Sequence, residues 1–349
     1  MKNFAYAGLA LVAGTGLALA GGIDRSGQDV SVIFEDGTYT MLSFGQVNPS
    51  VSGLVGGVVD SGDMAATYTQ FALGYKQAVS DKLDVALIVD QPFGANVAYP
   101  TGTGYPLAGT NAVLETRAFT VLGQYALSDR ATVLAGLRQQ SVEGDIFITG
   151  GYTLTASDSS GTGWLLGGAY EIPEYALRVA LVYNSAIDHT MSGTEVTLPS
   201  TFSIRTPQSV NLTAQSGIAE GTLLFGSMRW VDWDAFDITP NFYRGGALVS
   251  YDSDTFTWTA GIGRQFTENF AGSLSVGYEK QKGTPASNLA PTDGYTSIQL
   301  GGRYTKGNVT ISGGVRYIMI GDAITEAPVG GDFADNTGLA LGLQIGIQG

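Results

Sequence analysis

The stretch Thr337–Gln348, TGLALGLQIGIQ, decides the fold class, because leucine or isoleucine occupies every second position from residue 339 to residue 347. The residues between them are alanine, glycine and glutamine. Successive side chains of a β-strand point to opposite faces, so this pattern predicts a strand with one face in an apolar medium. The stretch Leu177–Asn184, LRVALVYN, repeats the pattern and predicts a second strand of the same kind.

Similar alternating segments follow one another from residue 38 to the end of the chain. We count fourteen of them, beginning near residues 38, 66, 83, 113, 131, 163, 177, 207, 222, 255, 270, 294, 309 and 337. Six tight gaps, such as residues 79–82 and 305–308, alternate strictly with seven long gaps, such as residues 141–162 and 186–206. Outer-membrane barrels have an even number of strands, short periplasmic turns and longer external loops. The sequence therefore predicts an all-β fold, a 14-stranded antiparallel transmembrane β-barrel over residues 38–349, with both termini on the short-turn side.

Aromatic residues mark both ends of the predicted strands. Tyr125, Tyr170 and Phe266 fall on the apolar face shortly before tight turns, whereas Trp230 and Tyr317 lie near long loops. Such rings collect at the two membrane interfaces of a barrel. A soluble β-sandwich or β-solenoid is the alternative for this strand pattern, and it does not predict aromatic residues at both strand ends.

The composition narrows the function classes. The chain has 349 residues with 50 glycines, no cysteine, 14% charged residues and a formal net charge of −14. Without cysteine there is no disulfide or thiolate metal site, and His189 is the single histidine, so we expect neither a metal nor a cofactor. The acidic balance argues against nucleic-acid binding, which needs clustered Lys and Arg. Soluble domains carry about 25% charged residues, so much of this surface is expected to face something other than water.

Residues 1–20 are expected to be a cleaved signal peptide. Lys2 supplies the positive start, residues 5–19 the short apolar run, and residues 18–20, Ala-Leu-Ala, the cleavage site. An uncleaved anchor is the alternative, although the run is short for a span of about 20 apolar residues. Export without a later spanning helix predicts the outer membrane of a Gram-negative bacterium, where a closed barrel is a permitted spanning form. This location implies outer-membrane lipid, lipopolysaccharide and the barrel assembly machinery as partners.

Residues 21–37, GGIDRSGQDVSVIFEDG, separate the signal peptide from the first predicted strand. The segment carries its own apolar residues, among them Val30, Val32 and Ile33. We expect it to fold into the lumen as a short N-terminal plug. A mobile periplasmic tail is the alternative.

The lumen face of the predicted barrel mixes polar and apolar side chains. A set of apolar residues would hold the apolar part of a ligand: Ile88, Leu122, Leu134, Val182 and Phe225. Two inward arginines, Arg138 and Arg316, are the candidates for meeting a carboxylate. The alternative is that all of these side chains merely fill the barrel.

Three stretches carry a resemblance to a known family. Residues 197–236, TLPSTFSIRTPQSVNLTAQSGIAEGTLLFGSMRWVDWDAF, contain an LP…P entry to a strand and a W…W…F pattern at Trp230, Trp233 and Phe236. Residues 90–94, DQPFG, lie at the end of the third predicted strand and resemble the "PFG" element of this family, and residues 22–53 resemble the N-terminal region of its members. On these stretches the chain resembles the outer-membrane long-chain fatty acid and hydrophobic compound transporters of the FadL and TodX type.

The resemblance implies a function for the barrel. Members of that family capture hydrophobic ligands from outside, hold them in an apolar pocket above a plug, and release them sideways through a kink in the third strand. Carried over to this sequence, the lateral gate falls at Pro92, Phe93 and Gly94. The resemblance therefore implies passive uptake of long-chain fatty acids or similar hydrophobic molecules, with no enzymatic activity. Two features depart from the family pattern, namely the short plug and the C-terminal residues Ile347, Gln348 and Gly349, which lack a terminal aromatic residue.

Two other functions remain open from the sequence. A general diffusion porin would use the inward charges to line a polar channel. An outer-membrane lipid-modifying barrel enzyme would need a histidine paired with Ser or Asp near the external rim. For that role the chain offers His189, with Asp188 and Ser185, in the predicted loop of residues 186–206.

Overall fold

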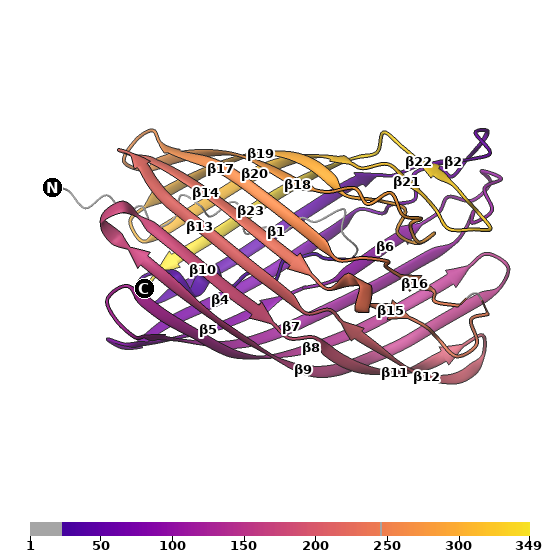
Figure 1. The fold of residues 1–349 in the computed structure, drawn as a ribbon, viewed down its shortest axis with the longest axis horizontal. Coiled ribbons are helices and arrows are strands. Elements are labelled where there is room, and N and C mark those ends of the chain that lie inside the picture. The colour runs from indigo at the N-terminus through magenta and orange to yellow at the C-terminus, as the bar shows by residue number, and fades with distance from the viewer. Residues whose placement is uncertain (1–22, 245) are drawn as a thin grey trace.

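The computed structural model describes residues 23–244 and 246–349, and the predicted signal peptide lies outside these residues. Within them, fourteen antiparallel wall strands close into a barrel, because the first wall strand pairs with the last along its whole length, from Tyr39 opposite Gln348 to Ser50 opposite Thr337 (Figure 1). This pairing brings the start of the first wall strand to the end of the barrel where the last one finishes. The predicted 14-stranded antiparallel barrel is therefore confirmed.

Eleven wall strands are continuous and three are interrupted. The continuous ones are β1 (Tyr39–Ser50), β4 (Tyr68–Ser80), β7 (Asn111–Ala126), β8 (Ala131–Ile148), β9 (Tyr152–Ile172), β14 (Thr222–Val231), β17 (Thr255–Gln265), β18 (Phe270–Glu279), β19 (Tyr295–Lys306), β20 (Val309–Ile320) and β23 (Thr337–Gln348). The interrupted ones are β5 (Leu83–Asp90) with β6 (Gly94–Ala98), β10 (Leu177–Asn184) with β11 (Ile187–Glu195), and β12 (Leu198–Thr206) with β13 (Ser209–Ala219).

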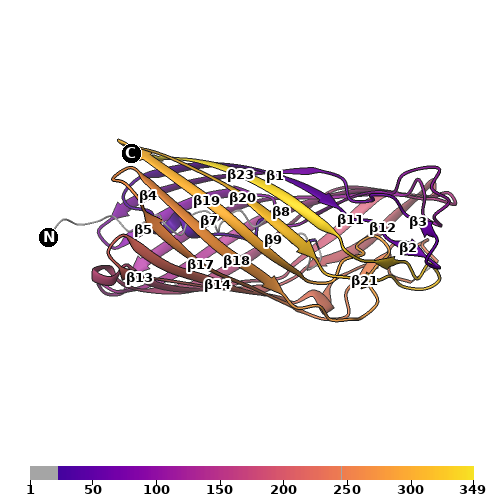
Figure 2. The ribbon, with the colours of Figure 1, turned by 90° about the horizontal axis from the view of Figure 1, so that it is seen from above.

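Shorter elements fill the two ends and the lumen. A small sheet of β2 (Leu54–Val55), β3 (Val59–Asp60), β21 (Ala323–Ile324) and β22 (Asp332–Phe333) lies at the end of the barrel opposite the C-terminus (Figures 1 and 2). A second pair, β15 (Asp237–Ile238) with β16 (Val249–Ser250), belongs to the external segment between β14 and β17. The 3-10 turns are η1 (Ser31–Phe34), η2 (Pro173–Tyr175) and η3 (Trp233–Ala235). No helix in the described residues is long and apolar enough to cross a membrane.

Two of the predicted long loops are wrong. Residues 141–162 continue β8 and begin β9, and these two strands are joined by a turn at residues 149–151. Residues 186–206 contain all of β11 and β12, which are joined by a turn at Val196 and Thr197. Short and long connections therefore do not alternate strictly. The outward positions of these stretches mostly carry Ser, Thr, Asp, Glu and Arg in place of Leu and Val, so the apolar half of the alternation is largely missing although the strands continue.

The outer wall carries an apolar band. Outward side chains such as Leu137 and Leu300 are 64% and 58% exposed. Tyr125, Tyr170 and Phe266 are exposed near the short turns, and Tyr278 and Tyr317 are exposed near the opposite strand ends. Above the band, outward positions become polar: Arg117 forms exposed ion pairs with Glu115 and Glu143. A continuous apolar belt between aromatic rings and a charged rim is the surface that a lipid bilayer requires.

We expect a charge in the middle of this belt to destabilise the barrel. Leu300→Arg should lower the free energy of unfolding in lipid vesicles by about 2–4 kcal/mol, because arginine at the bilayer midplane loses its hydration. Gln139→Arg is the matched control, since Gln139 is an exposed outward residue of β8 in the polar part of the wall. Urea titration of folded protein in vesicles measures both variants. Equal destabilisation of the two would contradict the assigned lipid-facing belt.

Candidate ligand-binding site in the lumen

The lumen consists of three layers, which can be followed along the wall strands. On β8, the inward side chains change from Leu134 through Arg138 and Gln140 to Val142, all of them buried. On β7 the same order runs from Leu122 through Thr120 and Thr116 to Ala112. An apolar layer thus lies near the short turns, a polar layer above it, and a second apolar layer toward the external loops. An uncharged hydrophobic molecule is favoured in the apolar layers and disfavoured in the polar one.

The lower apolar layer is packed by the plug. Val30, Val32 and Ile33, from the turn η1 and the residue before it, form one buried cluster with wall side chains. The wall side chains of this cluster include four of the predicted ligand-holding residues, Ile88, Leu122, Leu134 and Val182. These four residues therefore lie together in the lumen, as expected, but they contact the plug in this structure. The predicted plug segment therefore contacts the inner wall through residues 30–34.

The polar layer is built around a buried ion pair between plug and wall. Arg229, on β14, donates to the Asp24 carboxylate from Nε at 2.6 Å and from Nη2 at 3.2 Å. Both side chains are about 90% buried, with exposed fractions of 11% and 10%. Gln28 and Ser209 join this network, since the Ser209 hydroxyl donates to Gln28 Oε1 at 2.6 Å. A buried charge is costly unless it is paired and hydrogen-bonded, so this network fixes the plug in one position.

Arg138 lies in the same layer, and its guanidinium is hydrogen-bonded to side chains of nearby wall strands. Its Nε donates to Thr120 Oγ1 at 2.9 Å and its Nη1 to Asn184 Oδ1 at 3.0 Å. The second predicted arginine, Arg316, donates from Nε to Ser297 Oγ at 3.0 Å and stacks over the Tyr295 ring. Both arginines are buried on the lumen side of the wall, and neither lines the apolar cavity described next. Phe225 is likewise buried on β14 and lies outside that cavity.

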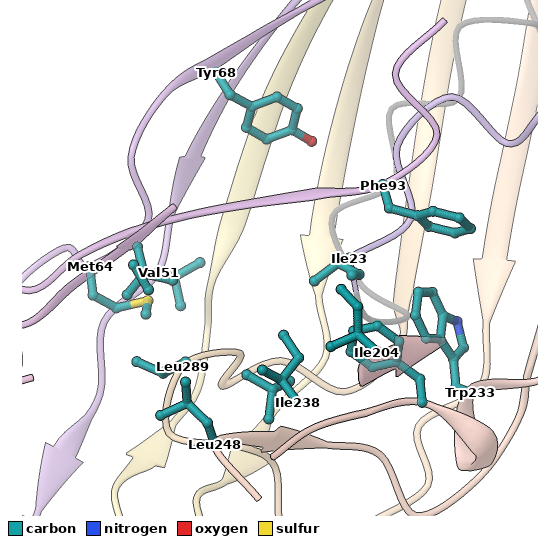
Figure 3. Close-up of a cluster of buried hydrophobic side chains, with 14 of the residues drawn as sticks. Ile23, Val51, Met64, Tyr68, Phe93, Ile204, Trp233, Ile238, Leu248 and Leu289 are labelled. Carbon is teal, nitrogen blue, oxygen red and sulfur yellow. The ribbon is translucent and has the colours of Figure 1, made fainter. Parts of the chain in front are cut away.

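The upper apolar layer contains a cavity with about 620 Å³ of empty space, a figure that includes the part open to solvent. Its walls come from the plug, the external halves of the wall strands and the external segments. They are almost entirely hydrocarbon, and the described lining residues are Ile23, Ala95, Val97, Ala112, Val113, Leu114, Gly144, Ile146, Leu154, Ala156, Met191, Phe202, Ile204, Ile238, Val249, Tyr251, Leu289 and Ala290. Several of them, including Ile23, Ile204, Ile238 and Leu289, meet in one buried cluster (Figure 3).

Sequence reasoning missed this cavity for a clear reason. Much of its lining belongs to β8, β9, β11 and β12 in stretches that were expected to be loops. The signal was present, because Leu154, Met191, Phe202 and Ile204 alternate with polar residues. That alternation marks an apolar interior with water outside, which is the reverse of the pattern in the lipid belt.

The wall is interrupted beside this cavity, between β5 and β6. Residues 91–93 of the interrupted strand face only Thr116 and Arg117 of β7, because Asp90 pairs with Ala118 and Gly94 pairs with Glu115. On the other side, pairing between β4 and β5 ends at Leu73 opposite Val89. The predicted gate residues Pro92, Phe93 and Gly94 thus lie at a true break in the ladder, as proline and an extra residue would cause.

The plug supplies the hydrogen bonds that the broken strand lacks. The Gly94 N–H donates to the Ile23 carbonyl, and the Arg25 N–H donates to the Pro92 carbonyl, both at 2.8 Å. The Phe93 N–H donates to Thr116 Oγ1 at 2.8 Å, and the same hydroxyl donates back to the Phe93 carbonyl at 2.7 Å. Buried backbone N–H and C=O groups need hydrogen-bond partners. Because the plug and Thr116 supply these partners, the break is stable without the usual neighbour strand.

Arg25 fastens the plug to the far side of the break. Its Nε donates to the Gly94 carbonyl at 2.9 Å, its Nη2 donates to Asn96 Oδ1 at 2.8 Å, and its guanidinium lies 3.5 Å from the centre of the Tyr68 ring. Gly94 permits this approach, since a Cβ there would lie 3.0 Å from Arg25 Nε. A second cavity lies beside the break and extends between β4 and β6. It shares five lining residues with the apolar cavity, namely Ile23, Ala95, Val97, Leu289 and Ala290.

The motifs that carried the family resemblance meet at this place. Phe93 packs edge-on against Trp233 with ring centres 5.8 Å apart, and Trp233 packs against Phe236 at 5.7 Å. All three side chains are fully buried, and Figure 3 shows Phe93 next to Trp233. The broken strand is thus held from the external side by η3, while the plug holds it from the lumen.

The arrangement expected of a barrel enzyme is not formed. His189 is buried on β11, with Nδ1 3.1 Å from the Ser159 carbonyl oxygen, whereas Asp188 points outward and pairs with Arg205. The predicted loop position of His189 is therefore wrong. Neighbours in a strand face opposite ways, so Asp188 cannot orient the His189 ring.

Breaking the ion pair in the polar layer should release the plug. Arg229→Met leaves the Asp24 carboxylate buried without its partner, which costs about 3–5 kcal/mol of plug docking. We expect increased ion conductance in planar bilayers and faster proteolysis of residues 23–37. Arg205→Met is the matched control, because Arg205 and Asp188 form the same two-point contact, at 2.7 Å and 3.2 Å, on the exposed surface. Its loss should cost less than about 1 kcal/mol and leave conductance unchanged. Wild-type conductance in Arg229→Met would contradict the assigned role of the pair.

Comparison with known proteins finds relatives in structure only. No family model and no curated protein matches the sequence. Among solved structures, a FadL homologue from Pseudomonas aeruginosa aligns at a TM-score of 0.74 and 14% identity over 96% of this chain and 97% of its own. The toluene transporter TodX of P. putida aligns at 0.69 and 14% over 91% and 92%, and the toluene transporter TbuX of Ralstonia pickettii at 0.66 and 11% over 96% of both chains. The chain therefore has the fold of the FadL-type barrels, as its sequence resemblance implied.

Proposed function

We propose that the protein is an outer-membrane channel for passive uptake of hydrophobic small molecules. One observation carries the proposal: an apolar cavity in the upper lumen lies against a break in the barrel wall, while the plug and a buried ion-paired layer close the lumen below it. A hydrophobic molecule is stabilised in such a cavity by about 25 cal/mol for each Å² of apolar surface removed from water. The fold shared with toluene transporters and a FadL homologue agrees with this function.

The lining of the cavity favours uncharged ligands. Among its described lining residues none carries a charged side chain, so a carboxylate inside would lose its hydration without compensation. Long-chain fatty acids, the ligands implied by the sequence resemblance, are the second candidate. The observation in their favour is Arg25, which lines the adjoining cavity at the strand break and offers a cation for a carboxylate. In that case Arg25, rather than Arg138 or Arg316, would contact the head group.

We also propose a lateral exit through the break between β5 and β6. The adjoining cavity lines the path between the plug, Tyr68 of β4 and Ala95 of β6. Below this level, Ile88, Leu122, Leu134 and Val182 would meet a ligand only after the plug moves. A ligand that leaves sideways avoids the buried charges of the polar layer, whose crossing would be costly for a hydrophobic molecule.

The remaining expectations follow from this function. Cleavage of residues 1–20, assembly by the barrel assembly machinery and contact with lipopolysaccharide are proposed as parts of an outer-membrane location in a Gram-negative bacterium. The enzymatic alternative would need Asp188 to contact His189, but the two side chains lie on opposite faces of β11. A general diffusion porin would need an open aqueous path, whereas the described plug packs against the wall in both lower layers.

Filling the cavity should abolish uptake. Ala156→Phe places a ring in the apolar cavity from β9, and we expect uptake of radiolabelled toluene by cells that carry this channel to fall at least about tenfold, because the site cannot enlarge without strain. Ala135→Phe, at an exposed outward position of β8, is the matched control and should behave as wild type. Parallel assays with radiolabelled oleate separate the two ligand classes. Unchanged uptake of both compounds in Ala156→Phe would contradict the proposed function.

Restoring a regular strand should block the lateral exit. Deleting Gln91 and replacing Pro92→Thr leaves two residues opposite Thr116 and Arg117, which restores the one-to-one register with β7. We expect normal assembly, normal toluene binding to the purified protein and loss of uptake by cells. Heat-modified migration in gels checks folding. Normal uptake in a correctly assembled variant would contradict the lateral exit. The proposal that the cavity binds the ligand would still stand.

A further inference from the structure

The apolar cavity contains one unusual side chain, that of Tyr251. It is the one described lining residue whose side chain carries an oxygen or nitrogen. Its hydroxyl is buried, and within residues 23–244 and 246–349 it finds no hydrogen-bond partner. Leaving a buried hydroxyl without a hydrogen bond is costly, so native structures contain few such groups. A group of this kind in a binding cavity is one that a ligand can satisfy.

Two aromatic neighbours hold the Tyr251 ring. Trp233 lies at 5.1 Å and Phe236 at 6.0 Å between ring centres, and both are fully buried. The hydroxyl is thereby held in place before a ligand arrives, and little side-chain entropy is lost when it forms a hydrogen bond. Burial also raises the pKa of the Tyr251 hydroxyl above its usual value, so the group keeps its proton and donates at neutral pH.

Tyr251 stands between the apolar cavity and a polar pocket. The polar pocket is bounded by Lys282, Asp293 and Ser253, and it shares Tyr251 and Ala290 with the apolar cavity. Two of its charged groups already have partners: the Lys282 ammonium donates to the Ser253 carbonyl, and the Asp293 carboxylate accepts from the Lys282 and Gly283 N–H groups. Among the described lining residues of the apolar cavity, Tyr251 alone can therefore donate a side-chain hydrogen bond to a ligand whose apolar body occupies that cavity.

We propose that Tyr251 selects uncharged hydrophobic compounds that carry one acceptor oxygen, with phenols as the representative class. The apolar ring of such a compound fills the hydrocarbon-lined space, and its oxygen accepts a hydrogen bond from Tyr251. A pure hydrocarbon leaves the hydroxyl unsatisfied, and a carboxylate finds no compensating cation in the cavity. This inference rests on the proposed function and names the ligand class of the same cavity.

The test compares p-cresol with toluene, which differ by one hydroxyl group. Binding of each to the purified full-length barrel in detergent is measured by calorimetry for wild type, Tyr251→Phe and Tyr243→Phe. Tyr251→Phe should weaken p-cresol binding about tenfold and change toluene binding less than about twofold, which corresponds to the loss of one buried hydrogen bond. Tyr243, in the same external segment, packs on Tyr152 outside the cavity lining, so Tyr243→Phe should change neither affinity.

The outcomes separate this inference from the proposed function. An unchanged ratio of the two affinities in Tyr251→Phe, or an equal loss for both compounds, would overturn the role of the hydroxyl while the channel function stands. Failure of both compounds to bind wild type would contradict the proposed function itself, and the inference with it.

Discussion

The requirement that every backbone polar group in a membrane be paired governs this barrel. A wall strand that breaks inside a bilayer exposes N–H and C=O groups that lipid cannot satisfy, at several kcal/mol for each group. Here the break between β5 and β6 is satisfied from inside, by the plug residues Ile23 and Arg25 and by the Thr116 hydroxyl. The plug is therefore a part of the wall as well as an obstruction of the lumen. This dual role links the two functions that a hydrophobic channel must combine, which are a closed axial path and a site of weakness in its side.

The order of the lumen layers gives this linkage a direction. The apolar cavity lies toward the outside, the Asp24–Arg229 pair lies below it, and the plug turn η1 packs the wall beneath. A hydrophobic ligand gains free energy by entering the first layer and would lose it in the second. Ile23 lines the cavity with its side chain, and its backbone carbonyl accepts the hydrogen bond from the Gly94 N–H of the broken strand. Ile23, which would contact a ligand in the proposed site, is thus adjacent in sequence to Asp24, which pairs with Arg229 and holds the plug.

The parts of this account that sequence could supply are those with a local signal. The period-two alternation of large apolar residues in β10 and β23 marks lipid-facing strands, and Pro92 marks the broken strand. The external halves of β8, β9, β11 and β12 were missed because their outward residues are polar, which removes the signature of lipid contact. The sequence did not reveal that Ile88 and the other apolar lumen residues contact the plug, for another reason. A lumen face looks the same in sequence whether a ligand or the plug covers it, and the contact with Val32 and Ile33 joins residues more than fifty positions apart. The meeting of Phe93 with Trp233 across 140 residues is equally invisible to local pattern.

A crystal structure of the protein soaked with bromobenzene tests the central claim most directly, because anomalous scattering places the bromine without assumption. The account predicts a bromine peak in the apolar cavity, among Ile23, Met191 and Leu289, with the Asp24–Arg229 pair intact beneath it. A peak in the polar layer, or bromine bound only on the lipid-facing wall, would contradict it.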